Sequence, residues 1–215
     1  MSWISYFIPQ IVARYSSPYN RDIRILEEQG KYKLLVNGSR QSGEYIRKLW
    51  QHAFVSFGII PSPDVRSILV LGVGGGTVIH LTRAIYPEAT IDAVDIDKQI
   101  IEIGKKYYNL SSVSGLSLIE SDARRYVDSS VREKKHWDMI IVDIFIGPTI
   151  PSFVLEDAFL RKIKSILTPR GTLLINYLRE REYKSLSDLL LDKLTRIFQS
   201  VRDTEIFFNR FFYAS

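Results

Sequence analysis

The stretch Ser67-Ile-Leu-Val-Leu-Gly-Val-Gly-Gly-Gly-Thr77 decides the fold of this chain. A short apolar run that leads directly into clustered glycines is typical of a buried parallel strand followed by a nucleotide-cradling loop. Glycine there lets the backbone approach a ligand that a Cβ atom would exclude. Asp95 ends the next apolar run, about 20 residues after Gly72, at the spacing of a carboxylate that binds a ribose hydroxyl. Together they predict a nucleoside site; a tight turn plus a helix-capping Asp is the alternative.

Strands and helices alternate from residue 65 onward. The apolar pattern predicts strands over 68–73, 90–94, 116–120, 139–143 and 172–176, and helices over 78–86, 98–107, 124–132, 156–167 and 186–198. Residues 204–208 and 211–213 are expected to form an antiparallel edge pair. Such alternation predicts an α/β, Rossmann-like fold with a doubly wound, mostly parallel sheet. Ligands then bind outside the carboxyl ends of its strands.

The N-terminal part has a different pattern. Residues 22–26 and 32–36 flank a Gln29-Gly30 turn and predict a small β-hairpin, and a helix should follow over 44–57. Residues 1–12 predict a docking helix or an oligomer contact, because their apolar side chains fall at helical spacing: Trp3, Ile4, Phe7, Ile8 and Ile11. We therefore divide the chain into an N-terminal region, 1–60, and a Rossmann-like domain, 61–215.

Composition limits the chemistry. The 215-residue chain has no cysteine and three scattered histidines, so neither a thiolate nucleophile nor a metal site is expected. No apolar run approaches 18 residues, so no transmembrane segment is expected. The start lacks the basic residues and cleavage site of a signal peptide, which favours a cytoplasmic location. The net charge of +5 is not arranged in a dense basic stripe, so no nucleic-acid partner is expected.

Four acidic residues fall at or just past predicted strand ends: Asp95, Asp97, Asp122 and Asp143. Those ends converge on one crevice in a doubly wound sheet. Each Asp by itself is also a common helix cap. Together they outline a nucleoside pocket, with Asp95 at the ribose, Asp122 near an adenine amino group and Asp143 at the reacting end.

The chain resembles the spermidine synthases and their relatives, which share the Rossmann-like fold of class I methyltransferases. The resemblance follows the glycine loop and the segments Val94-Asp-Ile-Asp97, Glu120-Ser-Asp-Ala123 and Trp137-Asp-Met-Ile-Ile-Val-Asp143. It implies S-adenosylmethionine or decarboxylated S-adenosylmethionine as the cofactor and Asp143 as the catalytic carboxylate. The cofactor-binding residues that it implies are Gly72, Gly74, Gly75, Gly76, Asp95, Ile96, Asp122, Ala123 and Asp143.

The resemblance extends to the acceptor side of the site. Gln51 and Asn176 align with polar residues that line the family's acceptor pocket, and Tyr177 either packs against the ligand or covers the sheet. Residues 144–151 resemble a loop of less characterised members and are expected to lie over the reacting end of the cofactor. The family commonly assembles through its N-terminal region, so a homodimer is expected.

Two departures from the family bear on the reaction. Aminopropyl-transferring members carry an Asp at the position of Gly75, where it pairs with the cofactor's free amine, and another at the position of Ile146. Each missing carboxylate removes a charge-assisted hydrogen bond worth about 1.5 to 3 kcal/mol. We therefore expect transfer of a methyl or related alkyl group to a small uncharged or anionic acceptor. Aminopropyl transfer and a non-catalytic cofactor-binding subunit remain the alternatives, and a dehydrogenase fits the glycine pattern less well.

Overall fold

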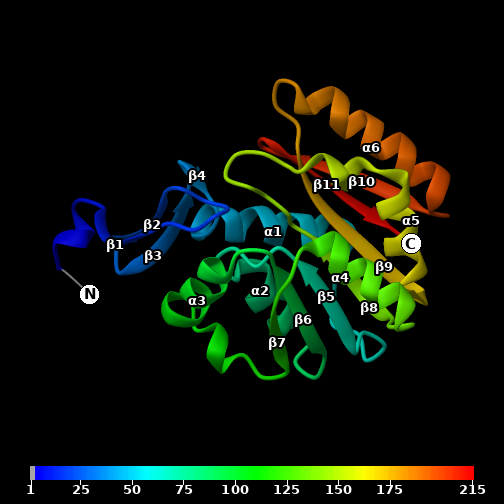
Figure 1. The fold of residues 1–215 in the computed structure, drawn as a ribbon, viewed down its shortest axis with the longest axis horizontal. Coiled ribbons are helices and arrows are strands. Elements are labelled where there is room, and N and C mark those ends of the chain that lie inside the picture. Colours follow the sequence, from blue (N-terminus) through cyan, green and yellow to red (C-terminus); the bar gives the residue numbers. More distant parts are fainter. Residues whose placement is uncertain (1–2) are drawn as a thin grey trace.

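The computed structural model describes residues 3–215, which form two β-sheets joined by a long helix (Figure 1). The larger sheet has the strand order β10-β11-β9-β8-β5-β6-β7. Its strands β7, β6, β5, β8 and β9 run parallel, and β11 and β10 add an antiparallel pair. The bounds of these strands are β5 Ser67–Leu71, β6 Thr90–Asp95, β7 Leu116–Glu120, β8 Trp137–Val142, β9 Leu167–Leu178, β10 Val201–Ile206 and β11 Asn209–Ala214.

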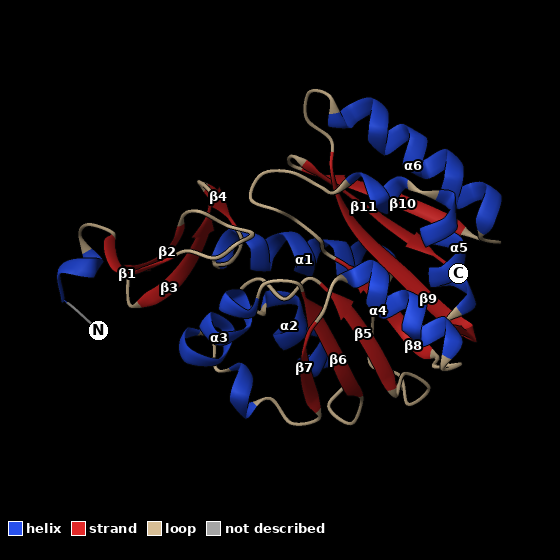
Figure 2. Ribbon diagram, viewed as in Figure 1, coloured by secondary structure: helices blue, strands red, loops and turns tan. Residues whose placement is uncertain are grey.

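Helices cover both faces of this sheet (Figure 2). Alternate residues of β5 point to opposite faces. Ile68 and Val70 pack with α1, α2, α3 and the smaller sheet, whereas Leu69 and Leu71 pack with α4, α5 and α6. The predicted doubly wound fold is therefore confirmed. The helix bounds are α1 Glu44–Phe57, α2 Thr77–Ile85, α3 Lys98–Tyr107, α4 Ala123–Arg132, α5 Asp157–Ser165 and α6 Tyr183–Ile197, with 3-10 turns at Trp3–Tyr6, Leu110–Ser112 and Ser152–Leu155.

The smaller sheet is antiparallel, in the order β1-β2-β3-β4. The predicted hairpin is present as its two central strands. The bounds are β1 Gln10–Tyr15, β2 Ile23–Glu28, β3 Lys31–Val36 and β4 Ser39–Arg40. Alternate side chains of β2, including Ile23 and Ile25, are fully buried against the larger domain.

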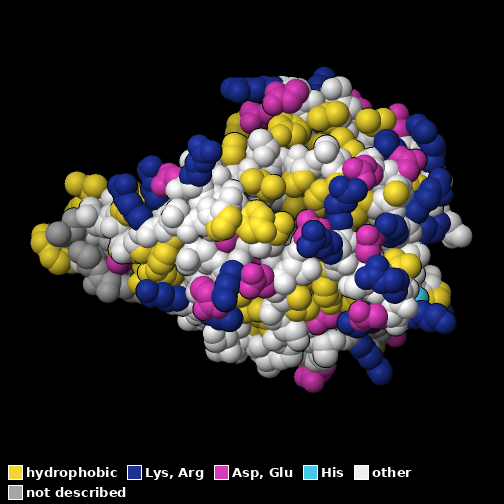
Figure 3. Space-filling view, viewed as in Figure 1, with side chains coloured by type: hydrophobic (Ala, Val, Ile, Leu, Met, Phe, Trp, Pro, Cys, Tyr) yellow, Lys and Arg dark blue, Asp and Glu magenta, His cyan; other side chains and the backbone are white. Residues whose placement is uncertain are grey.

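The predicted helix over residues 1–12 is wrong in the part that the structure describes. Trp3–Tyr6 forms a single 3-10 turn, and Gln10–Tyr15 forms β1, which pairs with β2. Pairing with β2 satisfies the backbone of this segment, and short apolar runs do not by themselves distinguish a strand from a helix. Met1 and the side chain of Ile4 lie outside the described residues. Hydrophobic side chains gather at this narrow end of the molecule (Figure 3), where Trp3 is 75% and Phe7 is 80% exposed.

Helix α1 connects the two sheets. It follows Gly43 and ends at Gly58, which adopts a left-handed conformation with φ of 69° and terminates the helix. Its inner face buries five residues: Leu49, Trp50, Ala53, Phe54 and Phe57. Trp50 contacts the ring of Phe211 on β11, so the helix is packed against the antiparallel part of the larger sheet. No helix in residues 3–215 is long and apolar enough to span a lipid bilayer.

Candidate functional site

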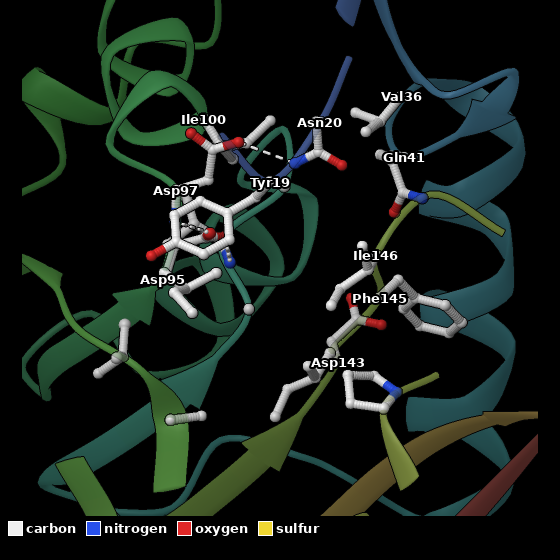
Figure 4. Close-up of a pocket in the computed structure, with 18 of the residues that line it drawn as sticks. Tyr19, Asn20, Val36, Gln41, Asp95, Asp97, Ile100, Asp143, Phe145 and Ile146 are labelled. Carbon is white, nitrogen blue, oxygen red and sulfur yellow. Dashed lines mark hydrogen bonds between the residues drawn. The ribbon is translucent and has the colours of Figure 1, made fainter. Parts of the chain in front are cut away.

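A cavity of about 320 Å³ opens at the carboxyl ends of β5, β6, β7 and β8, where the two sheets meet (Figure 4). Each strand end contributes one side of the lining, and the N-terminal sheet closes the cavity. The contributing segments are 72–74 after β5, 95–97 at the end of β6, 121–124 after β7 and 143–146 after β8, with Tyr19, Asn20, Val36 and Gln41 from the N-terminal region.

The glycine loop lies directly against the loop that follows β8. Gly72 has φ of 99°, and a Cβ atom there would lie 2.1 Å from the backbone oxygen of Asp143. Gly74, with φ of 50°, also lines the cavity. Glycine is therefore required for the backbone to pass between β8 and the ligand space.

The next two glycines serve packing rather than the cavity lining. A Cβ atom at Gly75 would lie 2.3 Å from Cβ of Ser42, and one at Gly76 would lie 2.5 Å from Cδ2 of Leu110. The structure does not bring either residue into the lining of the cavity, in contrast to the cofactor contacts expected for them. The space that a side chain at position 75 would need is occupied by the N-terminal region.

Asp95 ends β6 and its carboxylate reaches the cavity. Its Oδ2 accepts a hydrogen bond from the backbone N–H of Val73 at 2.9 Å, and its Oδ1 accepts one from the backbone N–H of Asp97 at 2.9 Å. Burial raises the pKa of Asp95 to about 6, although these backbone donors favour the ionised form. Ile96 lines the same part of the cavity.

The other strand-end carboxylates also cap helices. Asp97 accepts a hydrogen bond from the backbone N–H of Gln99 and caps α3, and Asp122 accepts one from the backbone N–H of Arg125 and caps α4. Both line the cavity as well, and Ala123 lies beside Asp122. Asp97 and Asp122 therefore both cap a helix and line the cavity.

Asp143 follows β8 and has a hydrogen-bond donor on each carboxylate oxygen. The side-chain amide of Asn176 donates to Oδ1 at 2.8 Å, and the indole N–H of Trp50 donates to Oδ2 at 3.2 Å. The side-chain amide of Asn209 donates to Oδ1 of Asn176 at 2.8 Å, which fixes the orientation of the Asn176 amide. Burial raises the pKa of Asp143 to about 6, against the effect of its two donors.

Not every residue expected on the acceptor side lies there. Asn176 contacts Asp143, but Gln51 lines neither of the cavities beside Asp143. Tyr177 is 1% exposed and packs in the core against Tyr183, so it covers the sheet. Trp50 and Asn209 were not expected to contribute. Trp50 lies on the buried face of α1, and the helical spacing of the apolar residues over 44–57 was the signal that selects it.

A second cavity, of about 220 Å³, lies on the other side of Asp143. It shares Gln41, Ile46, Asp143 and Phe145 with the larger cavity. The remaining lining includes charged and polar groups from both sheets, from α1 and from the segment after β9: Ser39, Arg40, Tyr45, Asn176, Glu180 and Asn209. Asp143 is therefore positioned at the junction of the two cavities.

The loop over residues 144–151 is attached to the N-terminal region. The side-chain amide of Gln41 donates to the backbone oxygen of Gly147 at 2.8 Å, and a turn is closed between Ile146 and Thr149. Phe145 from this loop lines both cavities. Phe145 and Ile146 of this loop lie beside Asp143 in the cavity lining (Figure 4).

A family model described as a methyltransferase domain matches residues 65–206. The chain belongs to this family. The match covers the strands whose ends line the larger cavity, from β5 to β10. The N-terminal sheet, which closes the cavity, precedes the matched part of this methyltransferase domain.

Known proteins similar to this methyltransferase domain include both methyl and aminopropyl transferases. A polyamine aminopropyltransferase of Vibrio vulnificus (strain CMCP6) is 30% identical over 119 residues, which cover 55% of this chain and 40% of that protein. The human eEF1A lysine and N-terminal methyltransferase is 32% identical over 120 residues, or 51% of this chain and 17% of that protein. The chain thus spans less than half the length of these curated relatives.

The chain is also similar to a solved structure of a methyltransferase-like protein. Human methyltransferase-like protein 13 in complex with SAH superimposes with a TM-score of 0.64 at 27% identity, covering 73% of this chain and 72% of that chain. The expected spermidine synthase-like protein with a methyltransferase fold is confirmed. The S-adenosyl cofactor class is also supported, either as S-adenosylmethionine or as its decarboxylated form.

The residues of the larger cavity fit such a cofactor. Asp95 presents carboxylate oxygens, which accept hydrogen bonds from ribose hydroxyls, and Gly72 and Gly74 leave backbone exposed to the ligand space. Asp122 and Ala123 line the same cavity, and Asp143 lies at the junction with the second cavity.

Proposed function

We propose that this domain binds S-adenosylmethionine in the larger cavity and transfers its methyl or a related alkyl group to a small acceptor in the second cavity. The observation that carries the proposal is the position of Asp143, which lines both cavities. The family match supports methyl transfer, and the enclosed junction provides a place where donor and acceptor atoms meet.

S-adenosylmethionine, when bound, supplies a methyl group activated by the adjacent sulfonium. The chain's own residues hold the acceptor and its proton. Asp143, fixed by Trp50 and Asn176, orients the nucleophile and accepts its proton. A positioned general base contributes about 100- to 10,000-fold in rate, and holding two reactants in contact contributes more. Phe145 limits the entry of water at the junction.

Aminopropyl transfer is the less favoured reaction. Position 75 has no room for the Asp that pairs with the amine of the decarboxylated cofactor, because Ser42 occupies that space. Ser42 is itself fixed, since it accepts a hydrogen bond from the backbone N–H of Leu34 and donates one to the hydroxyl of Tyr108. Ile146, at the other departure, is an apolar part of the lining.

The second cavity supports an acceptor of low charge. Arg40 lines it together with Glu180 and Asp143, so two carboxylates are partly balanced by one guanidinium. A polyamine carries several positive charges, each of which needs a carboxylate or other acceptor when it is buried. A small neutral nucleophile, such as an uncharged amine, matches this lining better.

A protein amine is the second candidate acceptor. The human relative is a lysine and N-terminal methyltransferase by name, and two phenylalanines lie in the turn beside the second cavity of this chain. Phe207 is 65% and Phe208 is 56% exposed. Exposed aromatic side chains next to an acceptor site provide a surface on which a polypeptide packs.

The test is a transfer assay with methyl-labelled S-adenosylmethionine. Small neutral amines, putrescine and a peptide with a free N-terminus are offered as separate acceptors to the wild-type chain and to Asp143→Asn. The proposal predicts labelled product with a neutral amine or the peptide and a loss of at least 100-fold in the variant. Turnover of putrescine to spermidine with the decarboxylated cofactor, at enzymatic rates, would contradict it.

We also propose a cytoplasmic homodimer that assembles through the N-terminal region. The exposed side chains of Trp3, Tyr6, Phe7 and Ile8 support this assembly, as does the edge strand β1, which pairs with β2 on one side. An edge strand with an apolar flank is a surface on which a second copy pairs.

A further inference from the structure

Tyr19 lines the larger cavity but comes from the connection between β1 and β2, and not from a strand end of the larger sheet (Figure 4). Its side chain is 45% exposed. Its hydroxyl has no hydrogen-bond partner among residues 3–215, and its ring is in neither hydrophobic core. Nothing in the fold of the domain therefore requires an aromatic ring at this place.

The backbone that carries Tyr19 is nevertheless held in one conformation. The hydroxyl of Ser17 accepts hydrogen bonds from the backbone N–H groups of Tyr19 at 3.2 Å and Asn20 at 3.0 Å. The backbone N–H of Ser17 donates to the backbone oxygen of Asn20 at 2.8 Å. Residues 17–20 thus form a tight turn with Tyr19 at its tip.

A buried carboxylate anchors this turn to the larger domain. Asp97 is 2% exposed, and its Oδ2 accepts hydrogen bonds from the hydroxyl of Ser17 and, at 2.8 Å, from the side-chain amide of Asn20. We call Ser17, Asn20 and Asp97 the latch. Asp97 follows Asp95 by two residues, so the latch ties the tip of the turn to the strand end that carries the expected ribose ligand. The side chain of Asn37 donates to Asn20 and supports the latch from β3.

We propose that Tyr19 is a cofactor-positioning residue whose ring covers the nucleoside part of the bound S-adenosyl cofactor. The inference rests on the proposed function and assigns a part of the cofactor site to the N-terminal region. A partly exposed ring gains burial when it packs on an adenosine, and because the latch fixes its backbone beforehand, little conformational entropy is lost on binding. The same contact forms with any ligand that retains the adenosine.

The latch also changes what a truncation would do. Removal of residues 1–18 keeps the glycine loop and Asp95, which lie elsewhere in the sequence. That truncation removes Ser17, and with it three of the hydrogen bonds that position Tyr19 and Asn20. Removal of residues 1–9, which ends before β1, leaves the latch intact and is the better probe of assembly.

The test is calorimetric titration with S-adenosylhomocysteine and with methylthioadenosine, neither of which needs an acceptor. Tyr19→Ala is expected to lower the affinity for both ligands at least fivefold, without a change in the melting temperature of the protein. Tyr19→Phe keeps the ring and is expected to restore the affinity. Tyr6→Ala is the matched control, because Tyr6 is also an exposed N-terminal tyrosine but does not line the cavity.

The outcomes separate this inference from the function on which it rests. If the wild-type chain binds and Tyr19→Ala binds within twofold of it, the role of Tyr19 is wrong while the proposed function stands. If the wild-type chain binds neither ligand, the role of Tyr19 and the proposed function are both overturned. As an independent check, Asn20→Ala, which opens the latch but keeps the ring, is expected to weaken both ligands by an intermediate factor; an unchanged affinity would contradict the role of the latch.

Discussion

At the scale of single residues, the site depends on how two carboxylates are solvated. Asp95 receives backbone donors, and Asp143 receives one indole and one amide donor. No cationic side chain in residues 3–215 forms an ion pair or a hydrogen bond with either carboxylate. The effect of burial is therefore larger than the effect of the donors, and it raises the pKa of each carboxyl to about 6. Both are therefore largely ionised at neutral pH and able to accept hydrogen bonds from a ligand.

Asp95→Ala should weaken the binding of methylthioadenosine at least tenfold, because the ribose hydroxyls lose a hydrogen bond to a charged acceptor worth about 1.5 to 3 kcal/mol. Affinity in the wild type should also fall as the pH drops through about 6, since protonation removes the carboxylate. Calorimetric titration between pH 5 and 8 measures both effects. Asp64→Ala, at an exposed position, is the control. Equal affinity in a folded Asp95→Ala variant would contradict the assignment.

Trp50→Phe should raise the pKa of Asp143 further above its usual range, because the variant loses the indole donor to Oδ2 but keeps an aromatic ring against Phe211. The loss of a hydrogen bond to a charged group corresponds to an increase of about one pKa unit. A pH titration of the carboxyl carbon resonance measures it, with Trp3→Phe as the control. An unchanged pKa would show that the indole does not stabilise the ionised carboxylate.

At the scale of elements, the strand ends and their loops place the functional groups. The sequence pattern predicts α1 over 44–57 and α3 over 98–107 at their observed bounds, because their apolar spacing is strong and their ends carry clear signals. It fails at β1, where a strand is specified by pairing with β2. The contacts of Asp143 with Trp50 and Asn176 join residues 93 and 33 positions apart, and no local pattern encodes them.

Gly75→Asp should destabilise the domain by about 1 to 3 kcal/mol, because the new side chain overlaps Ser42 in a packed region. Urea denaturation measures the change. In a Ser42→Gly background the same substitution should cost less, since the overlapping atoms are gone. The two variants and their combination form a double-mutant cycle. If Gly75→Asp is as stable as the wild type, or creates spermidine synthase activity, the packing argument against aminopropyl transfer fails.

At the scale of the whole molecule, the site is closed by two sheets that belong to different parts of the chain. The predicted Rossmann-like fold is confirmed, but the contribution of Tyr19 and the latch to the cavity depends on a contact between sheets that the sequence does not reveal. Dividing the chain at residue 60 remains a prediction, and the cavity between the sheets indicates that cofactor binding depends on both parts.

Stability of the ligand-free chain should be greater at pH 5 than at pH 7. The pKa values of Asp95 and Asp143 are raised in the folded state, so their protonated forms favour folding. This contribution is fully present below the unfolded pKa of about 4 and is lost as pH rises through about 6, at about 1 kcal/mol for each carboxyl between pH 5 and 7. Urea denaturation at both pH values measures it. If the Asp95→Asn, Asp143→Asn double variant keeps the full difference in unfolding free energy between pH 5 and pH 7, these two carboxyl groups are not its cause.

The homodimer is tested by light scattering at micromolar concentration. The wild-type chain should be a dimer, and removal of residues 1–9 should convert it largely to a monomer, because the exposed side chains of Trp3, Phe7 and Ile8 are lost while β1 and the latch are kept. Binding of S-adenosylhomocysteine should be retained in the truncated chain. A monomeric full-length protein would rule out the dimer.

The central claim, that the larger cavity holds an S-adenosyl cofactor used for methyl transfer, is tested most directly by comparing two ligands that differ by one carboxylate. Calorimetric titration with S-adenosylmethionine and with its decarboxylated form measures both affinities on the same protein. With Gly75 in place of an Asp and Ser42 filling the adjacent space, S-adenosylmethionine should bind at least as tightly as the decarboxylated form. Tenfold tighter binding of the decarboxylated cofactor would contradict the account.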